Sequence, residues 1–157
     1  MALQSFSNAF LDWARERVLA ASDGLVSGGC LFDEREQGLG ELIRKSLASK
    51  LGYCVALSLA SAKRVAVKES PDDTVHRVSC TVAVFRSALA AGLSLAECAW
   101  LAESLYVAFC GAYFSPVPGT GRPDVHADDF VPRVEANGAA VFTFTIAFEK
   151  DIDVINN

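Results

Sequence analysis

The stretch Val141-Phe142-Thr143-Phe144-Thr145-Ile146-Ala147-Phe148 decides the fold, because large apolar side chains occupy every second position in it. Successive side chains of a β-strand point to opposite faces of the sheet, so one face of this strand is predicted to form core. Asn137-Gly138 comes just before it and is the strongest short signal for a two-residue hairpin turn. We therefore expect residues 131–135 to be its partner strand. The predicted core face carries Phe142, Phe144, Ile146 and Phe148.

A second hairpin is predicted upstream of this strand. In residues 75–86 the apolar side chains alternate with Arg77, Ser79 and Thr81, which is typical of a half-buried strand. Residues 53–68 alternate in the same way, and Ser70-Pro71-Asp72-Asp73 between the two segments has the composition of a turn. These two strands are therefore expected to pair with each other.

Helices are predicted on both sides of this hairpin. Ser94-Leu95-Ala96-Glu97 has the form of a capping box, so a helix is expected to begin at Ser94 and to extend to Gly111. Trp100 and Tyr106 make its apolar stripe wider than burial on one side needs, which leaves apolar surface for a partner. Apolar residues at helical spacing predict another helix over 7–22 and a short one over 38–51, with a loop over 22–37.

Residues 113–133 contain four of the five prolines of the chain, together with Gly119 and Gly121. This composition predicts a long irregular loop. Loops of such length within a compact domain are usually either functional or disordered. Either alternative is compatible with the sequence of this segment.

Together these elements predict an α+β fold. Its sheet is expected to be mixed and mainly antiparallel, with about four strands, one helix packed across one face and an N-terminal helix. A chain of 157 residues has the size of one domain, so residues 1–157 are expected to share one core. Hydrophobic residues make up 52% of the chain and charged residues 21%, a balance that excludes the disordered, collagen-like and coiled-coil classes.

Charge and hydropathy restrict the expected partners. The 14 basic and 19 acidic residues leave a net charge of −5, which argues against a nucleic-acid-binding domain. No apolar run reaches the roughly 18 residues that a membrane helix needs. Asp12 and Arg15 interrupt the apolar stretch that a signal peptide would require. We therefore expect neither nucleic acid nor a membrane as a partner.

The five cysteines include no C-x-x-C pair, so a disulfide framework is not predicted. A thiol within an apolar run usually behaves as a small buried hydrophobe in a reducing compartment. The interpretation as buried thiols covers Cys54, Cys80, Cys98 and Cys110.

The nearest candidate for a metal site is the set Asp124, His126, Asp128 and Asp129, because alternate residues of an extended segment can point the same way. A solvated acidic loop explains the same residues, so we predict no metal and no cofactor. The segment 119–122 lacks the Lys-Ser/Thr pair and the strand-to-helix context of a phosphate-binding loop.

No catalytic motif is found. The chain has no G-x-S-x-G sequence, and His76 lies beside a predicted turn, where it would be exposed. Asp128-Asp129 has the composition of a loop, where water keeps both carboxylates ionised and neither becomes a general acid. We therefore predict no catalytic residue and do not expect an enzyme.

The order of helix, variable loop, two strands, capped helix, long loop and aromatic-rich final strand resembles the tail terminator proteins of long-tailed bacteriophages, including related tail-completion and minor tail proteins. The likeness is carried by the segments 76–85, 95–106 and 142–149. Such proteins are small α+β domains that form a ring, commonly hexameric, at the end of the tail tube. Residues 24–51 depart from the pattern, because they are longer than the segment that usually precedes the first strand.

This resemblance implies a structural assembly protein whose partners are further copies of itself, the tail tube protein and a head-completion protein. It would lie in the host cytoplasm during assembly and then in the virion tail. The candidate interface residues are Lys63, Arg64, Trp100 and Arg122. The alternative is a small α+β ligand-binding domain or enzyme that uses a pocket under the 113–133 loop.

Overall fold

The computed structural model describes residues 3–67, 73–112, 114 and 125–153, with side chains at 7–59, 77–112, 114 and 125–148. Three helices and five strands make up this part of the chain, which confirms the predicted α+β class. In chain order they are α1 (Leu3–Ala21), β1 (Leu31–Asp33), α2 (Leu39–Ala48), β2 (Tyr53–Val67), β3 (Asp73–Arg86), α3 (Leu95–Phe109), β4 (His126–Val134) and β5 (Ala140–Asp153).

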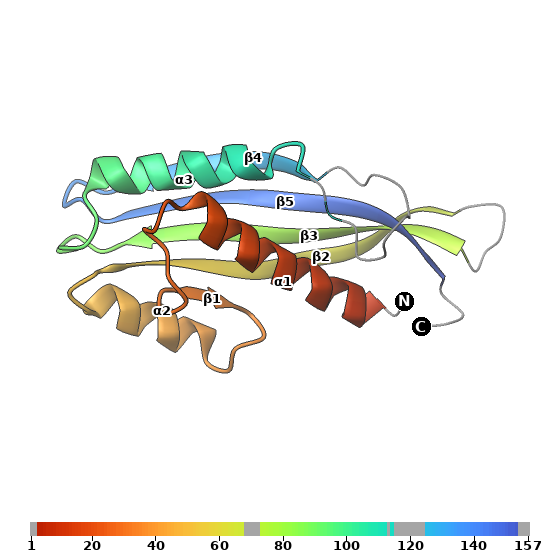
Figure 1. The fold of residues 1–157 in the computed structure, drawn as a ribbon, viewed down its shortest axis with the longest axis horizontal. Coiled ribbons are helices and arrows are strands. Elements are labelled where there is room, and N and C mark those ends of the chain that lie inside the picture. The colour runs from red at the N-terminus through yellow and green to blue at the C-terminus, as the bar shows by residue number, and fades with distance from the viewer. Residues whose placement is uncertain (1–2, 68–72, 113, 115–124, 154–157) are drawn as a thin grey trace.

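The strands form one mixed sheet in the order β1-β2-β3-β5-β4. Only the short β1 runs parallel to its neighbour, and the β2–β3, β3–β5 and β4–β5 pairs are antiparallel. Both predicted strand pairings are therefore confirmed, although most of the turn at 70–73 lies outside the described residues. The predicted two-residue turn at Asn137-Gly138 is wrong, because the Gly138 N–H donates to the Glu135 carbonyl and the Glu135 N–H donates to the Ala139 carbonyl, which leaves residues 136–138 in the loop. Helices α1 and α3 lie across one face of the sheet, the helix face, and α2 lies beside β1 (Figure 1). The opposite side is called the open face below.

Two segments that are predicted to be loops contain strands. The predicted loop at 22–37 contains β1, so the sheet of the described residues has five strands where about four are predicted. The three residues of β1 are too few to show an alternating pattern. The loop predicted at 113–133 is a strand from His126 onward, and residues 115–124 lie outside the described part. Pro132 is tolerated there because β4 is an edge strand.

The helix face of the sheet forms the core as predicted. Phe144, Ile146 and Phe148 are at most 1% exposed and Phe142 is 4% exposed. They pack against rings from both helices, including Phe10 of α1 and Phe109 of α3. The alternating residues of β3 that share this face are also buried, namely Val78, Cys80, Val82 and Val84.

The capping box at the start of α3 is confirmed. Ser94 Oγ accepts a hydrogen bond from the Glu97 backbone N–H at 3.1 Å, and Glu97 Oε1 accepts one from the Ser94 N–H at 3.1 Å. Tyr106 packs its ring against Phe130 of β4, and its hydroxyl donates to the Ala127 carbonyl at 3.1 Å. Strand β4 therefore covers Tyr106, which accounts for part of the width of the apolar stripe of α3. Trp100 stays 47% exposed.

The prediction of buried thiols holds for three of the four cysteines. Cys54, Cys80 and Cys98 are fully buried, and this burial raises the pKa of Cys54 and Cys80 to about 12 and that of Cys98 to about 11. Cys110 is exposed, so the prediction is wrong for it. It follows the last residue of α3, where the buried stripe of the helix has ended.

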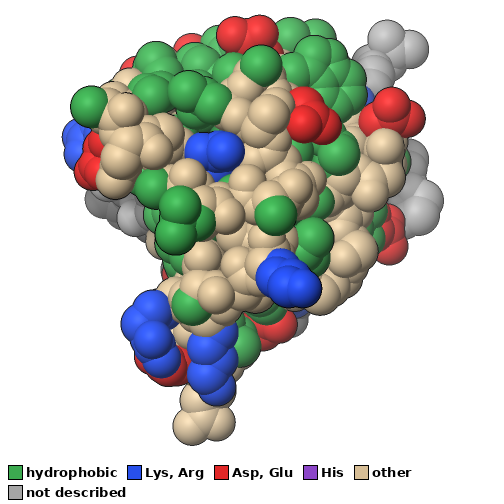
Figure 2. Space-filling model, turned by 90° about the vertical axis from the view of Figure 1, so that its left-hand side faces the viewer, with side chains coloured by type: hydrophobic (Ala, Val, Ile, Leu, Met, Phe, Trp, Pro, Cys, Tyr) green, Lys and Arg blue, Asp and Glu red, His purple; other side chains and the backbone are tan. Residues whose placement is uncertain are grey.

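Charge is unevenly distributed at the end of the molecule shown in Figure 2. Several Lys and Arg side chains lie along the lower edge, over α2, and others lie near the centre and at the upper left, whereas hydrophobic and acidic side chains lie along the upper edge, over α3. The sequences agree with this view, because α3 contains two glutamates and no basic residue, while α2 contains Arg44 and Lys45 against Glu41.

Gly52, at the start of β2, is a position where no other residue fits. Its φ is +71°, and a Cβ there would lie 2.6 Å from the Cα of Ala90. Gly52→Ala is therefore expected to lower the free energy of unfolding by about 2 kcal/mol, through left-handed backbone strain and displacement of the 87–92 loop. Urea denaturation followed by circular dichroism measures this.

Gly40→Ala is the matched control, because Gly40 lies in α2 with nothing within 4 Å of its would-be Cβ. That substitution is expected to raise the free energy of unfolding by about 0.5 to 1 kcal/mol, since alanine is the better helix former. Equal stabilities of the two variants would contradict the close approach at Gly52.

Candidate functional site

The open face of the two central strands carries no charge over most of its length. Cross-strand pairs from Phe85 and Val141 to Ser79 and Ala147 place only small, hydroxylic or apolar side chains there. A sheet face that meets water normally presents polar and charged residues. This strip is therefore unusual for a surface that stays solvated. Its members are Ser79, Thr81, Ala83, Phe85, Val141, Thr143, Thr145 and Ala147.

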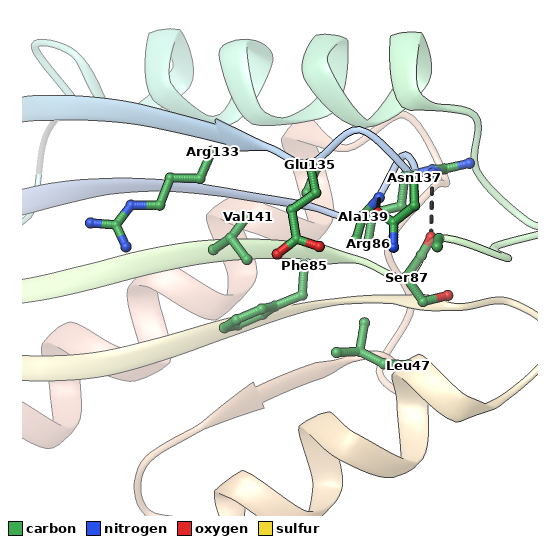
Figure 3. A pocket seen from close by; sticks show the side chains of 11 residues that line it. Leu47, Phe85, Arg86, Ser87, Arg133, Glu135, Asn137, Ala139 and Val141 are labelled. Carbon is green, nitrogen blue, oxygen red and sulfur yellow. Dashed lines mark hydrogen bonds between the residues drawn. The ribbon is translucent and has the colours of Figure 1, made fainter.

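At one end the strip leads into a hollow of about 510 Å³, here called the open-face groove. Phe85 and Val141 form its floor, Leu47 of α2 points into it from one side, and the turn between β4 and β5 borders the other side (Figure 3). The groove is thus a trough on the sheet surface between a helix and a hairpin. Its lining consists of Leu47, Phe85, Arg86, Ser87, Ala88, Arg133, Glu135, Asn137, Ala139, Ala140 and Val141.

Two exposed charged side chains stand at the hairpin side of the groove. The Glu135 carboxylate extends over the floor toward Phe85 and Val141, while Arg133 points along the sheet (Figure 3). Among the described residues neither of them forms an ion pair. Both charges are therefore available to a molecule that enters the groove.

Arg86 holds the hairpin side of the groove in place. Its guanidinium donates hydrogen bonds to the backbone carbonyls of Leu93, Ser87 and Gly138, and so joins the β3–α3 loop to the turn before β5. The turn itself is closed by the Glu135 N–H, which donates to the Ala139 carbonyl at 2.8 Å. Gly138 adopts a φ of +91°, which glycine accommodates without strain.

The chemistry that this lining supports is binding. Its ionisable side chains are Arg86, Arg133 and Glu135, and the Arg86 guanidinium is engaged by three carbonyls. The described lining contains no cysteine or histidine that could act as a nucleophile or general base. An apolar floor with charges at the margin fits an apolar side chain flanked by charged neighbours.

A second hollow, of about 390 Å³, lies at the described border of the segment 113–133. Cys110 and Gly111 line it from the end of α3, and the first residues of β4 line it from the other side. His126, Asp128 and Asp129 of the candidate metal set are exposed here, and Asp124 lies outside the described residues. Within the described part of the chain, no three His, Cys, Asp or Glu side chains are placed to hold a metal ion.

The structure does not bring the four candidate interface residues together at the groove. Trp100 lies on α3, and Arg122 lies outside the described residues. The backbones of Lys63 and Arg64 in β2 pair with Arg77 and His76 of β3. Arg77 is about 30 Å along β3 from Arg86 at a rise of about 3.3 Å per residue. Their role as interface residues stays a prediction.

The groove is absent from the sequence-based predictions, although the sequence carries one signal for it. Phe85 follows Arg77, Ser79 and Thr81 on the face of β3 that alternation assigns to solvent. A large aromatic residue on that face indicates contact with something beyond the sheet. Leu47 and Glu135 carry no comparable signal, because only the tertiary fold brings α2 and the hairpin together.

An ion-pair cluster centred on the buried Asp33 joins α1 to β1. Asp33 is 2% exposed, and its carboxylate accepts hydrogen bonds from Arg15 at 3.0 Å and from Arg35 at 2.9 Å. Arg35 also pairs with Asp12 of α1 at 2.8 Å, and Glu36 accepts from the Asp33 N–H at 2.7 Å. Because its charged groups pair with one another, the cluster serves the fold rather than a ligand.

None of the helices in the described part of the chain is long and apolar enough to cross a membrane. Comparison with protein-family models and with curated proteins found no match for this chain.

Proposed function

We propose that this chain is a structural assembly protein of a phage or prophage tail, a subunit of a ring that caps the tail tube and joins it to the head. The observation that carries the proposal is the open face, where an uncharged strip ends in an apolar-floored groove. Broad surfaces of this kind on small proteins mark contacts with other proteins. The ring geometry, commonly hexameric, comes from the resemblance to tail terminator proteins.

The sheet edge formed by β4 is poorly suited to pairing with a strand of another chain. Pro132 cannot donate a hydrogen bond, and the ladder is interrupted between Asp128 and Val131, where Asp129 has a φ of +60°. Proline, bulges and charged residues are the features by which natural sheets prevent edge-to-edge pairing. A partner strand therefore has little to pair with along β4.

Tube-length distributions test the proposed function. Adding the protein to the polymerising tail tube protein of the same genome is expected to shorten the tubes and narrow their lengths, as seen by electron microscopy. Phe85→Asp is expected to lose this effect while keeping its circular dichroism spectrum, because a charge on the groove floor opposes docking. Leu89→Asp is the control, since Leu89 is 90% exposed and does not line the groove.

Two results would count against the proposal. Unchanged tube lengths with the wild-type protein would contradict the capping function itself. Equal capping by Phe85→Asp and wild type would show that the open face is not the interface. The solution mass adds an independent measurement, because a closed ring has a fixed multiple of the subunit mass.

The alternative function is a ligand-binding domain that uses the second hollow, which lies where a pocket near residues 113–133 was expected. Its described ionisable residues, Cys110, His126 and Asp128, are exposed, whereas binding sites for small molecules usually enclose their polar groups. A small molecule that co-purifies with a monomeric protein, and that His126→Ala releases, would favour this alternative.

A further inference from the structure

Helix α3 is apolar on its outer side as well as on its buried side. Five of its residues are buried against the sheet and α1. On the opposite side Trp100 is 47% exposed and Val107 is 67% exposed, and a separation of seven residues places them in one row along the helix. Glu97 and Glu103 lie on either side of this row. These four residues are called the α3 ridge.

A helix that is apolar around most of its circumference is normally covered on all sides. In the described part of the chain nothing covers the α3 ridge, because all four of its side chains are exposed. The ridge therefore has the character of a surface that another protein covers.

One charge of the open-face groove complements the ridge. The ridge carries two acidic side chains and no basic one. In the groove lining, exposed Arg133 offers a positive charge at the hairpin side, and Glu135 of the same hairpin carries the opposite charge. An apolar row flanked by acids thus fits the apolar floor when a ridge glutamate lies against Arg133 and away from Glu135.

We infer that the α3 ridge of one subunit docks into the open-face groove of the next subunit. This inference rests on the proposed assembly function and names its contact. Trp100 and Val107 would cover Phe85 and Val141, with Glu103 next to Arg133. Because ridge and groove are different surfaces on opposite sides of the sheet, each subunit contacts two neighbours, head to tail. Such heterologous contacts close into a ring when the rotation between subunits allows it.

The expected contact between two free subunits is weak. A helix of 15 residues is about 22 Å long, so one side of it covers less than the roughly 800 Å² per partner of a standard interface. Charges at the margin of a contact are screened by salt. The association is therefore expected to weaken as ionic strength rises and to strengthen when a ring closes.

Disulfide trapping suits a weak contact. All variants carry Cys110→Ser, which removes the exposed thiol. Protein with Leu47→Cys is mixed under mild oxidation with protein that carries either Trp100→Cys or Val107→Cys. At least one mixture is expected to give a covalent dimer in at least tenfold higher yield than any variant alone. The matched control mixes Leu47→Cys with Leu89→Cys, because Leu89 is more exposed than either ridge residue but lies outside the ridge.

A charge exchange tests whether opposite charges pair across the contact. Glu103→Arg and Arg133→Glu are each expected to lower the trapping yield at least fivefold, and the two changes in one chain are expected to restore it. Sedimentation velocity of the same variants without cysteine substitutions gives a second measurement. Yields at the level of the Leu89 control, with no effect of either charge reversal, would overturn the inference.

These outcomes separate the inference from the proposed function. If the wild type shortens tubes while the trapping yield stays at the control level, the ring uses another contact and only the inference fails. If trapping is specific while tube lengths do not change, subunits associate as inferred but the capping function is wrong.

Discussion

Phe144→Ala is expected to lower the free energy of unfolding by about 3 to 5 kcal/mol, a large share of the roughly 5 to 15 kcal/mol that stabilises a domain. Phe144 is 1% exposed, and its ring lies 5.5 Å from that of Tyr106 and 6.1 Å from that of Phe109. Removing it would leave a cavity where β5 meets α3. Urea denaturation at pH 7 measures the loss, and the variant is expected to be partly or wholly unfolded at 37 °C.

Thr145→Ala is the matched control for this substitution. Thr145 is the next residue of β5, and its side chain lies half-exposed on the open face. The change is therefore expected to alter the free energy of unfolding by less than about 0.5 kcal/mol. If both variants unfolded at the same urea concentration, the assignment of the two faces of β5 would be wrong.

The faces of the central strands could be predicted from the sequence because alternation is a local signal. In β5 and β3 the period of two assigns each side chain to a face without knowledge of the tertiary structure. The start of α3 is equally local, since Ser94 and Glu97 satisfy each other's backbone groups. These features depend on residues within a few positions of one another.

The errors concern features that depend on tertiary contacts. Strand β1 exists because Leu31–Asp33 pairs with Val55–Leu57 of β2, and three residues carry no period of their own. Strand β4 contains Pro132 and a bulge near Asp129, which remove the alternating pattern and give it the composition of a loop. In both cases pairing with a long neighbouring strand outweighs local propensity.

The groove could be predicted only in part, for the same reason. Phe85 was visible as an aromatic residue on a polar face, but its neighbours Leu47 and Glu135 come from elements far apart in the sequence. More of the α3 ridge could be predicted, because the width of the apolar stripe of this helix already indicated contact with a partner. The structure then separated Tyr106, which packs against β4, from Trp100, which stays exposed.

Asp33→Asn is expected to lower the free energy of unfolding by about 3 kcal/mol at pH 7. The substitution keeps the shape of the side chain but removes the charge with which Arg15 and Arg35 pair, and hydrogen bonds to charged groups contribute about 1.5 to 3 kcal/mol each. Glu41→Gln is the matched control, because it breaks an ion pair with Arg44 that is exposed to solvent. Exposed pairs within a helix contribute at most a few tenths of a kcal/mol, so this variant is expected to unfold like the wild type.

The pH dependence of the Asp33 effect provides a sharper test than its size. Burial alone would raise the pKa of Asp33, but the hydrogen bonds from Arg35 and Arg15 outweigh it and bring the pKa from 3.8 to about 2. The contribution of the carboxylate is therefore complete above the unfolded pKa and is lost as the pH falls toward the folded one. The difference in unfolding free energy between wild type and Asp33→Asn should thus be constant above about pH 5 and shrink between about pH 4 and about pH 2. A difference that stays constant down to about pH 2 would mean that the arginines do not stabilise the ionised carboxylate of Asp33.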